Sequence, residues 1–396
     1  MANRIMLNET SYHGAGAIQE IANEAKARAF KKAFVCSDPD LIKFGVTGKV
    51  TDVLDNSGLA YEIYSDIKAN PTIENVQHGV QAFKDAEADY IIAIGGGSSM
   101  DTAKAIGIII ANPEFEDVRS LEGVAPTKNP CVPIIAVPTT AGTAAEVTIN
   151  YVITDVEKKR KFVCVDSHDM PVIAVVDPEM MSSMPKGLTA STGMDALTHA
   201  VEAYIGNSTT IDTRRDALKA VKLIFENIDI AYEHGDNIQA RRNMLHASFY
   251  AGCAFTKSYV GYVHAVAHSL GGQYNVPHGL ANAILLPLVL REYGSCIDKK
   301  LHRLAIAAGL ADKNTPDHEA AELFIRAIEE MKERFGIVNI VKEIQETDIP
   351  KLAHYADKEA NPLYPVPRLM DASELEKFYY MLMSLTSKEN TSEAEK

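Results

Sequence analysis

The chain has 396 residues, of which 46% are hydrophobic and 23% are charged. This is enough for two or three domains around a large core, and it is too apolar for a disordered chain. The formal net charge of −14 argues against nucleic acid or an anionic membrane surface as the main partner. The five cysteines are scattered and form no C-x-x-C motif, so we expect a reducing cytoplasm rather than a disulfide framework. We find no run of 18 apolar residues and no apolar leader in the first ten residues, and therefore expect neither a membrane span nor an export signal.

The first half of the chain alternates short apolar runs with segments of helical periodicity. The predicted strands cover 33–37, 60–64, 90–94, 132–137 and 172–177, and the predicted helices cover 18–29, 42–57 and 73–86. Strands that alternate with helices predict βαβ units and a parallel sheet. Two further segments, 146–154 and 161–165, predict a hairpin with a charged turn at 157–160.

Helical periodicity dominates after about Pro185, over 193–204, 212–232, 240–255, 263–273, 317–335 and 373–385. Thr192 is a candidate N-cap for the first of these helices. We therefore predict two domains: an α/β nucleotide-binding domain over 1–185 with a Rossmann-like parallel sheet, and an all-helical domain over 186–396. The cleft between them is the expected place for a functional site.

A glycine-rich turn follows one predicted strand directly. The strand 90–94 runs into Gly95-Gly96-Gly97-Ser98, and a helical pattern begins near Thr102. Backbone N–H groups in such a turn can approach a phosphate closely, and the following helix adds a partial positive charge. A tight turn without a ligand is the alternative. The run is not G-x-G-x-x-G, so the common dinucleotide fingerprint is absent.

Polar residues follow two other predicted strands. Asp38 follows 33–37, where its carboxylate could bind a ribose 2′-hydroxyl and repel a 2′-phosphate, which would favour NAD over NADP. Capping of the loop before Pro39 explains Asp38 equally well. The segment 138–143 follows 132–137 and contains Thr139, Thr140 and Thr143. These hydroxyls suit ligand binding at the mouth of an open sheet, or a simple Ser/Thr turn.

Aspartate and histidine residues, which commonly bind metal ions, recur at helical spacing in the second half of the chain. Asp195 and His199 are four residues apart, as are His264 and His268, and His278 follows in Pro277-His278-Gly279, where we expect a rigid turn. Each pair alone is explained by a surface contact or by a satisfied core histidine. Together they provide five candidate ligands for a site that needs about three or four protein groups. Imidazole and carboxylate suit a divalent metal such as iron or zinc.

The combined motifs resemble those of the iron-containing (group III) alcohol dehydrogenases over about residues 1–350. The resemblance is carried by Gly95-Gly96-Gly97-Ser98 with Asp101, by 138–143 with Glu146, by 193–199, and by His264-x-x-x-His268 through Pro277-His278-Gly279-x-x-Asn282. It implies a dehydroquinate synthase-like fold, an NAD cofactor and Fe²⁺, with Zn²⁺ as the alternative. It also implies a small-molecule alcohol or aldehyde as substrate, and a homodimer or larger homo-oligomer.

The resemblance also implies a role for individual residues. The metal ligands would be Asp195, His199, His264 and His278, while His268 would lie near substrate and nicotinamide as the catalytic residue. Gly96, Gly97 and Ser98 would hold the pyrophosphate, and Asp38 would meet the adenosine ribose. The remaining positions expected along the cofactor and the cleft are Asn70, Thr139, Thr140, Thr143, Asn150 and Lys161.

Within the family, the resemblance to lactaldehyde reductases is carried by residues 1–4, 8–10, 112–115, 118–123, 143–154 and 161–166. It implies reduction of lactaldehyde by NADH to 1,2-propanediol. Other group III alcohol dehydrogenases, acting on ethanol, butanol or 1,3-propanediol, are the alternative. A metal-dependent lyase or synthase of the same fold, or a non-catalytic metal protein, are more distant rivals. The segment 357–368 departs from the family pattern, because the cysteine expected beside the substrate is missing there.

Overall fold

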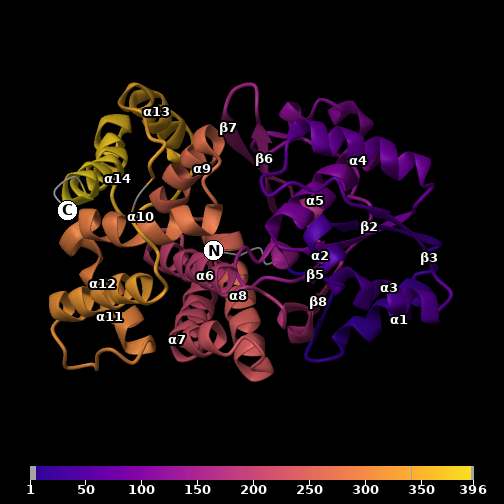
Figure 1. Ribbon diagram of the computed structural model, residues 1–396, viewed down its shortest axis with the longest axis horizontal. Coiled ribbons are helices and arrows are strands. Elements are labelled where there is room, and N and C mark those ends of the chain that lie inside the picture. Colours follow the sequence, from indigo (N-terminus) through magenta and orange to yellow (C-terminus); the bar gives the residue numbers. More distant parts are fainter. Residues whose placement is uncertain (1–5, 340, 394–396) are drawn as a thin grey trace.

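The computed structural model describes residues 6–339 and 341–393 (Figure 1). Residues 1–5, which belong to the N-terminal segment predicted to lack a leader, lie outside the described part. The strands are β1 (Thr10–His13), β2 (Lys32–Ser37), β3 (Ala60–Tyr64), β4 (Tyr90–Gly95), β5 (Ile134–Pro138), β6 (Asn150–Asp155), β7 (Arg160–Val165) and β8 (Ile173–Val176). All five predicted sheet strands are present, whereas β1 is too short and too polar to have been predicted.

Six of the strands form one parallel sheet in the order β1-β8-β5-β4-β2-β3. The helices of this α/β part are α1 (Glu20–Ala27), α2 (Pro39–Lys43), α3 (Val46–Asn56), α4 (Ile73–Asp85) and α5 (Gly97–Ala111). The helix predicted over 42–57 is divided into α2 and α3 at Gly45, whose φ of +73° is left-handed. The α/β part therefore has the predicted Rossmann-like architecture.

Helices cover both faces of the sheet (Figure 1). Ile91 and Ala93 of β4 pack with residues of α4 and α5, whereas Ile92 and Ile94 pack with residues of α1 and α3. This alternation follows from the two-residue period of a strand, because successive side chains point to opposite faces. Burial on both faces explains why the predicted strands are almost continuously apolar.

The strand order places a topological switch point between β2 and β4. The chain leaves β2 toward β3 on one side and then crosses back to β4 on the other side. In open parallel sheets, ligands bind outside the carboxyl ends of the strands at such a point. Asp38 follows β2 there, and Gly96 joins β4 directly to α5. The helix begins at Gly97, earlier than the start near Thr102 that the sequence predicts, so part of the glycine turn is its first turn.

The second half of the chain is helical and lies beside the sheet (Figure 1). Its helices are α6 (Lys186–Ile205), α7 (Ile211–Glu233), α8 (Ile238–Ser258), α9 (Tyr262–Tyr274), α10 (His278–Tyr293), α11 (Asp298–Ala307), α12 (Asp317–Arg334), α13 (Ile349–Ala360) and α14 (Ala372–Glu393). They enclose one large apolar core. The last strand of the sheet ends at Val176 and α6 begins at Lys186, on either side of the predicted domain boundary.

Two local predictions in this half are wrong. Thr192 is not an N-cap, because α6 already begins at Lys186 and the Thr192 hydroxyl donates to the carbonyl of Leu188 at 2.8 Å. His278 is not in a turn: it is the first residue of α10, with Pro277 at the N-cap. Proline is well tolerated at a helix start because no intrahelical bond is lost there.

One helical stretch, His278–Ala307, has the length and hydropathy of a membrane span. In the fold, 61% of its most apolar window is buried. Leu285, Leu286 and Val289 belong to the same core as α6. A core helix meets the same criteria, so the apolar composition of this stretch is explained by its packing.

The predicted hairpin is present as antiparallel β6 and β7, although the first strand begins at Asn150 rather than at residue 146. The hairpin packs on α5 and α9. Lys104 of α5 is buried and donates to the carbonyls of Thr148 and Asn150 at 2.7 and 2.9 Å. Asp101 accepts a bond from Val152 N at 3.1 Å. These bonds hold the hairpin against the helix that starts at the glycine turn.

Candidate active site

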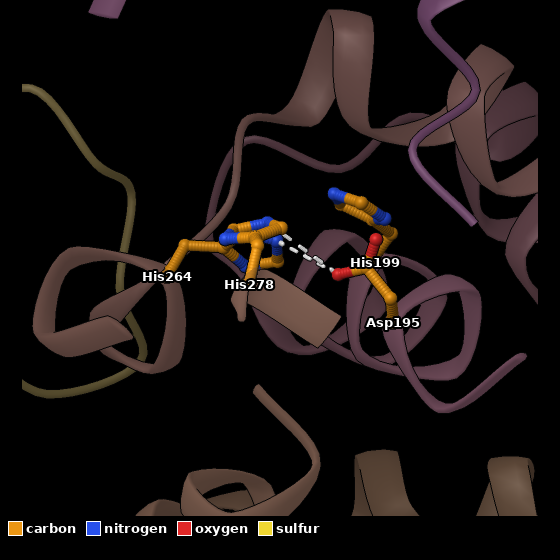
Figure 2. A group of neighbouring side chains, drawn as sticks. All are labelled: Asp195, His199, His264 and His278. Carbon is orange, nitrogen blue, oxygen red and sulfur yellow. Dashed lines mark ion pairs between the residues drawn. The ribbon is translucent and has the colours of Figure 1, made fainter. Parts of the chain in front are cut away.

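Four side chains of the kinds that bind metal ions, from three helices, meet in the helical half (Figure 2). We call these residues, Asp195, His199, His264 and His278, the metal-type cluster. Asp195 and His199 lie one turn apart on α6, His264 lies on α9, and His278 begins α10. One ligand atom from each lies within 4.8 Å of every other. Asp195 Oδ1 is 3.5 Å from His278 Nε2 and 4.0 Å from His264 Nε2, and the rings of His199 and His264 stack at 4.4 Å.

The close approach of α6 and α10 depends on a glycine. A Cβ atom on Gly279 would lie 2.5 Å from the backbone oxygen of Ser191 and 3.5 Å from Asp195 Cβ. Backbone atoms cannot move aside as a flexible side chain can, so any larger residue would push α10 away from α6. Gly279 therefore sets the distance between His278 and Asp195.

We expect Gly279→Ala to destabilise the protein by about 1–3 kcal/mol through overpacking and to weaken metal binding. Gly187→Ala is the matched control, because Gly187 is also helical and its added Cβ meets no atom within 4 Å. Urea unfolding of the metal-free variants and metal titration would measure both effects. Equal stability of the two variants would contradict this account of helix spacing.

Burial controls the charge of this cluster. Burial and the neighbouring His264 hold the pKa of His199 well below its ordinary value, and burial with His268 does the same for the pKa of His278. Burial raises the pKa of Asp195, against the opposing effect of His264. Burial alone would lower the pKa of His264, but the hydrogen bond and charge of Glu202 outweigh it and raise that pKa. Neutral imidazole is the form that binds a metal, so His199 and His278 are ready to act as ligands.

Two buried residues support the cluster. Glu202 lies on α6 and accepts from the backbone N–H groups of Gly261 and Val263 at 2.9 and 2.8 Å. Its Oε2 is 2.6 Å from His264 Nδ1. A carboxylate at Nδ1 leaves the ring lone pair on Nε2 of His264, as in carboxylate–histidine–metal arrangements. In this structure that Nε2 lies 3.2 Å from the Nδ2 atom of Asn282. The Nδ2 atom of buried Asn282 is 2.7 Å from Asp195 Oδ1 and 3.1 Å from His278 Nε2.

The cluster fits a divalent metal ion. Ligand atoms 2.0–2.2 Å from a tetrahedral ion are separated by roughly 3.4 Å. Here Asp195 Oδ1 is 3.5 Å from His278 Nε2, and the four ligand atoms all lie within 4.8 Å of one another, so the group is somewhat wider than a closed ligand shell. Three of the four residues are buried. Burying a carboxylate together with imidazoles is costly unless hydrogen bonds or a bound ion satisfy them. One carboxylate and three imidazoles suit iron or zinc.

His268 lies one turn after His264 on α9 but is not among the four mutually close ligand groups. Its ring stacks on that of His278 with centroids 5.1 Å apart. Its Nδ1 is 2.8 Å from Glu359 Oε1. The structure thus places His268 beside the cluster, on the wall of the adjoining cavity. Its catalytic role stays a prediction.

The metal-type cluster opens into a cavity of about 710 Å³ between the sheet and the helices. This volume lies in the range of cofactor and small-molecule sites. His199, His264, His268 and His278 line its helical side. On the other side it is lined by six of the ten residues predicted to bind cofactor: Asn70, Gly97, Ser98, Thr143, Asn150 and Lys161.

Asn70 and Lys161 connect the two walls of this cavity. Lys161 of β7 donates to Asn70 Oδ1 at 2.7 Å, and Asn70 Nδ2 donates to Asn275 at the end of α9. Burial lowers the pKa of Lys161 to about 8, so this amine is still mostly protonated at neutral pH. These bonds fix three parts of the chain relative to one another: the β6–β7 hairpin, the loop before α4, and helix α9.

The other predicted cofactor residues, Asp38, Gly96, Thr139 and Thr140, are not among the residues that line this cavity. They follow the carboxyl ends of β2, β4 and β5. Gly96 is the N-cap of α5, and a Cβ there would come within 2.9 Å of Thr140 Oγ1. Thr139 N donates to the carbonyl of Gly95 at 3.0 Å. Asp38 caps α2 by accepting from Leu41 N at 3.0 Å. The capping explanation of Asp38 is therefore observed, and its contact with a ribose stays a prediction.

Three side chains at the site have no role in the sequence analysis: Glu202, Glu359 and Tyr364. A signal for Glu202 was available, because Asp195, His199 and Glu202 follow i, i+4, i+7 spacing on one helix face. Glu359 and Tyr364 lie in the divergent segment 357–368, where no spacing links them to His268. Tyr364 Oη donates to Glu359 Oε1 at 2.8 Å.

Two family models together match most of the chain. Residues 8–178 match the family model described as iron-containing alcohol dehydrogenase, and residues 189–383 match that of its C-terminal domain. The chain is 47% identical over 358 residues to lactaldehyde reductase of Escherichia coli K12, covering 90% of this chain and 93% of that protein.

Solved structures have the same fold. A crystal structure of 1,3-propanediol oxidoreductase superposes with a TM-score of 0.91 at 37% identity, covering 96% of this chain and all of the other. Sulfoacetaldehyde reductase of Bifidobacterium kashiwanohense, in complex with NAD⁺, superposes with a TM-score of 0.83 at 28% identity, covering 97% and 99%. The three-helix metal-type cluster and these matches lead to one conclusion: the chain belongs to the iron-containing alcohol dehydrogenase family.

Proposed function

We propose that this enzyme transfers hydride between NAD(H) and a short vicinal diol or hydroxyaldehyde, reducing lactaldehyde to 1,2-propanediol. One observation carries the proposal: the metal-type cluster and the glycine turn at the start of α5 open onto the same cavity. The substrate rests on the 47% identity to lactaldehyde reductase of Escherichia coli. Fe²⁺ is the proposed metal, with Zn²⁺ as the alternative.

Asp195, His199, His264 and His278 would hold the metal. When bound, the metal supplies Lewis acidity toward the substrate oxygen, and the nicotinamide supplies the partner for hydride. His268 lies on the cavity wall beside His278, where it would exchange the substrate proton directly or through water. The close packing of α6, α9 and α10 keeps these imidazoles oriented before substrate arrives.

The cofactor would lie along the carboxyl edge of the sheet. Gly96, Gly97 and Ser98 at the start of α5 would hold the pyrophosphate, since the helix N-terminus offers N–H donors and partial positive charge. Asp38, after β2 at the switch point, would meet the adenosine ribose. Thr139, Thr140, Thr143, Asn150, Asn70 and Lys161 would line the cofactor between these points and the metal.

Anaerobically purified, iron-loaded protein should oxidise NADH when lactaldehyde is added, and should reduce NAD⁺ with 1,2-propanediol. The measurement is absorbance of the reduced nicotinamide, over a panel of C2–C4 aldehydes, alcohols and diols with metal analysis of the same sample. Stronger activity on ethanol, butanol or 1,3-propanediol would replace the proposed substrate. No nicotinamide-linked activity on any member would overturn the proposal and favour a lyase or synthase.

Glu202 provides a test that depends on metal affinity. We expect Glu202→Gln to lower affinity for the metal by about 10- to 100-fold, because loss of the carboxylate weakens the basicity and orientation of His264. Glu226→Gln is the control, since Glu226 is an exposed acid on α7 beside Lys222. Competition with a chelator of known affinity would measure both variants. Unchanged affinity would show that Glu202 only caps the start of α9.

We also propose a homodimer or larger homo-oligomer in the cytoplasm. All five cysteines are free, which suits a reducing compartment. Light scattering of the purified protein would determine the oligomeric state, and a monomer would contradict that expectation.

A further inference from the structure

A carboxylate from the divergent C-terminal segment lies against the proposed catalytic histidine. Glu359 is in the last turn of α13, and its Oε1 is 2.8 Å from His268 Nδ1. Both side chains are largely buried, with 16% and 7% of their surfaces exposed. Both residues line the cavity that holds the metal-type cluster. Glu359 therefore acts from inside the site rather than from the protein surface.

A second residue of the same segment holds Glu359 in place. Tyr364 lies beyond the end of α13, and its hydroxyl donates to Glu359 Oε1 at 2.8 Å. Burial and the charge of Glu359 raise the pKa of Tyr364 well above its ordinary value, so the phenol stays protonated and remains a donor. The oxygen Oε1 thus accepts a hydrogen bond from the tyrosine and lies within hydrogen-bond distance of the histidine ring.

The segment that carries these residues is fixed to the helix that carries His268. Asn361 Oδ1 accepts from the hydroxyl of Tyr262, the first residue of α9, at 2.9 Å. Asn361 Nδ2 donates to the carbonyl of Met370 at 2.9 Å. The carbonyl of Pro365 accepts from Asn207 N at 2.6 Å. The histidine and its carboxylate partner are therefore held by one connected framework, not by a loop contact alone.

The chemistry of this pairing determines where the ring proton sits. An ionised carboxylate can only accept hydrogen bonds, so His268 must carry its proton on Nδ1 to bond Glu359. The other nitrogen, Nε2, then bears the free lone pair. Since Nδ1 is engaged by Glu359, Nε2 is the nitrogen available to a group inside the cavity. A neutral histidine side chain without such a partner favours the opposite tautomer, with the proton on Nε2.

We propose that Glu359, held by Tyr364, is a positioning residue that fixes His268 in the Nδ1–H tautomer with Nε2 ready to accept the substrate proton. The proposal rests on the proposed role of His268. The segment 357–368, which lacks the cysteine expected beside the substrate, thereby has a function in the reaction. Glu359 acts through the ring and does not itself contact the reacting atoms.

The first test observes the tautomer directly and does not depend on activity. Full-length, zinc-loaded protein labelled with ¹⁵N-histidine would be compared with its His268→Gln variant, so that the difference spectrum isolates the His268 nitrogens. We expect a protonated Nδ1 in the wild type and in Glu359→Gln, whose amide oxygen still accepts. Glu359→Leu should shift His268 toward the Nε2–H form. A wild-type signal already in the Nε2–H form would overturn the proposal.

The second test is a double-mutant cycle on kcat/KM for the alcohol. We expect Glu359→Leu to lower it by about 10- to 100-fold, as for other groups that orient a catalytic imidazole, while KM for NAD⁺ stays unchanged. Glu359→Gln should recover most of the loss. Glu346→Leu, which replaces an exposed carboxylate just before α13, should retain wild-type activity.

The cycle also separates this proposal from the proposed function. In a His268→Ala background, Glu359→Leu should have little further effect, because the ring on which it acts is gone. An undiminished loss in that background would show that Glu359 acts independently of His268, which overturns the positioning role but leaves the proposed function intact. If His268→Ala alone has no effect on turnover, the proposed catalytic role itself is wrong.

Discussion

Asp195→Asn should abolish activity while leaving the fold intact. Asparagine has the same shape, but it removes the one carboxylate of the four-residue cluster and with it the charge that attracts a divalent cation. Loss of the Lewis acid removes several kcal/mol of transition-state stabilisation, which corresponds to a fall in kcat/KM of about 10³-fold or more. Metal analysis of the anaerobically purified variant, together with NADH-linked activity, would measure both losses.

Stability of the metal-free protein is the control for this variant. Burial raises the pKa of Asp195, so its ionised form is unfavourable in the metal-free fold. A neutral amide should therefore leave urea unfolding of the metal-free protein unchanged or shifted to higher denaturant. The wild type should gain stability when the metal is added, and the variant should not. A variant that retains stoichiometric metal would show that Asp195 is not a ligand.

His268→Ala should slow turnover by about 10²- to 10⁴-fold, the usual contribution of a general acid–base group. The metal content should stay at the wild-type level, because His268 lies outside the group of mutually close ligand atoms. The measurement is kcat with lactaldehyde and NADH under anaerobic conditions, beside metal analysis of the same preparation.

His318→Ala is a suitable control for that variant, because His318 is an exposed histidine on α12 paired with Asp298. It should have wild-type turnover and metal content. If His268→Ala loses the metal instead, the assignment of the four ligands is wrong and His268 belongs among them. A fall in turnover with the metal retained would support its role in proton transfer.

Much of the α/β part could be predicted because its signals are local. The apolar runs at β2, β4 and β5 and the glycine turn after β4 are visible in short windows of sequence. The strand β1 has no apolar run and forms because β8 offers it a parallel edge. The start of α10 was mistaken for a turn because Pro277 and Gly279 are also typical of turns. In the fold, Pro277 is the N-cap, and Gly279 is required by contact with α6.

By itself, the sequence determined which side chains share a helix face, because helical spacing is a property of neighbouring residues. This placed Asp195 with His199 and His264 with His268, and the same spacing already contained Glu202. Only the tertiary structure decided which faces meet, since α6, α9 and α10 are distant in the chain and their separation depends on core packing and on Gly279. That packing set His268 apart from the four clustered groups and brought Glu359, from a segment without a recognisable motif, to its Nδ1 atom.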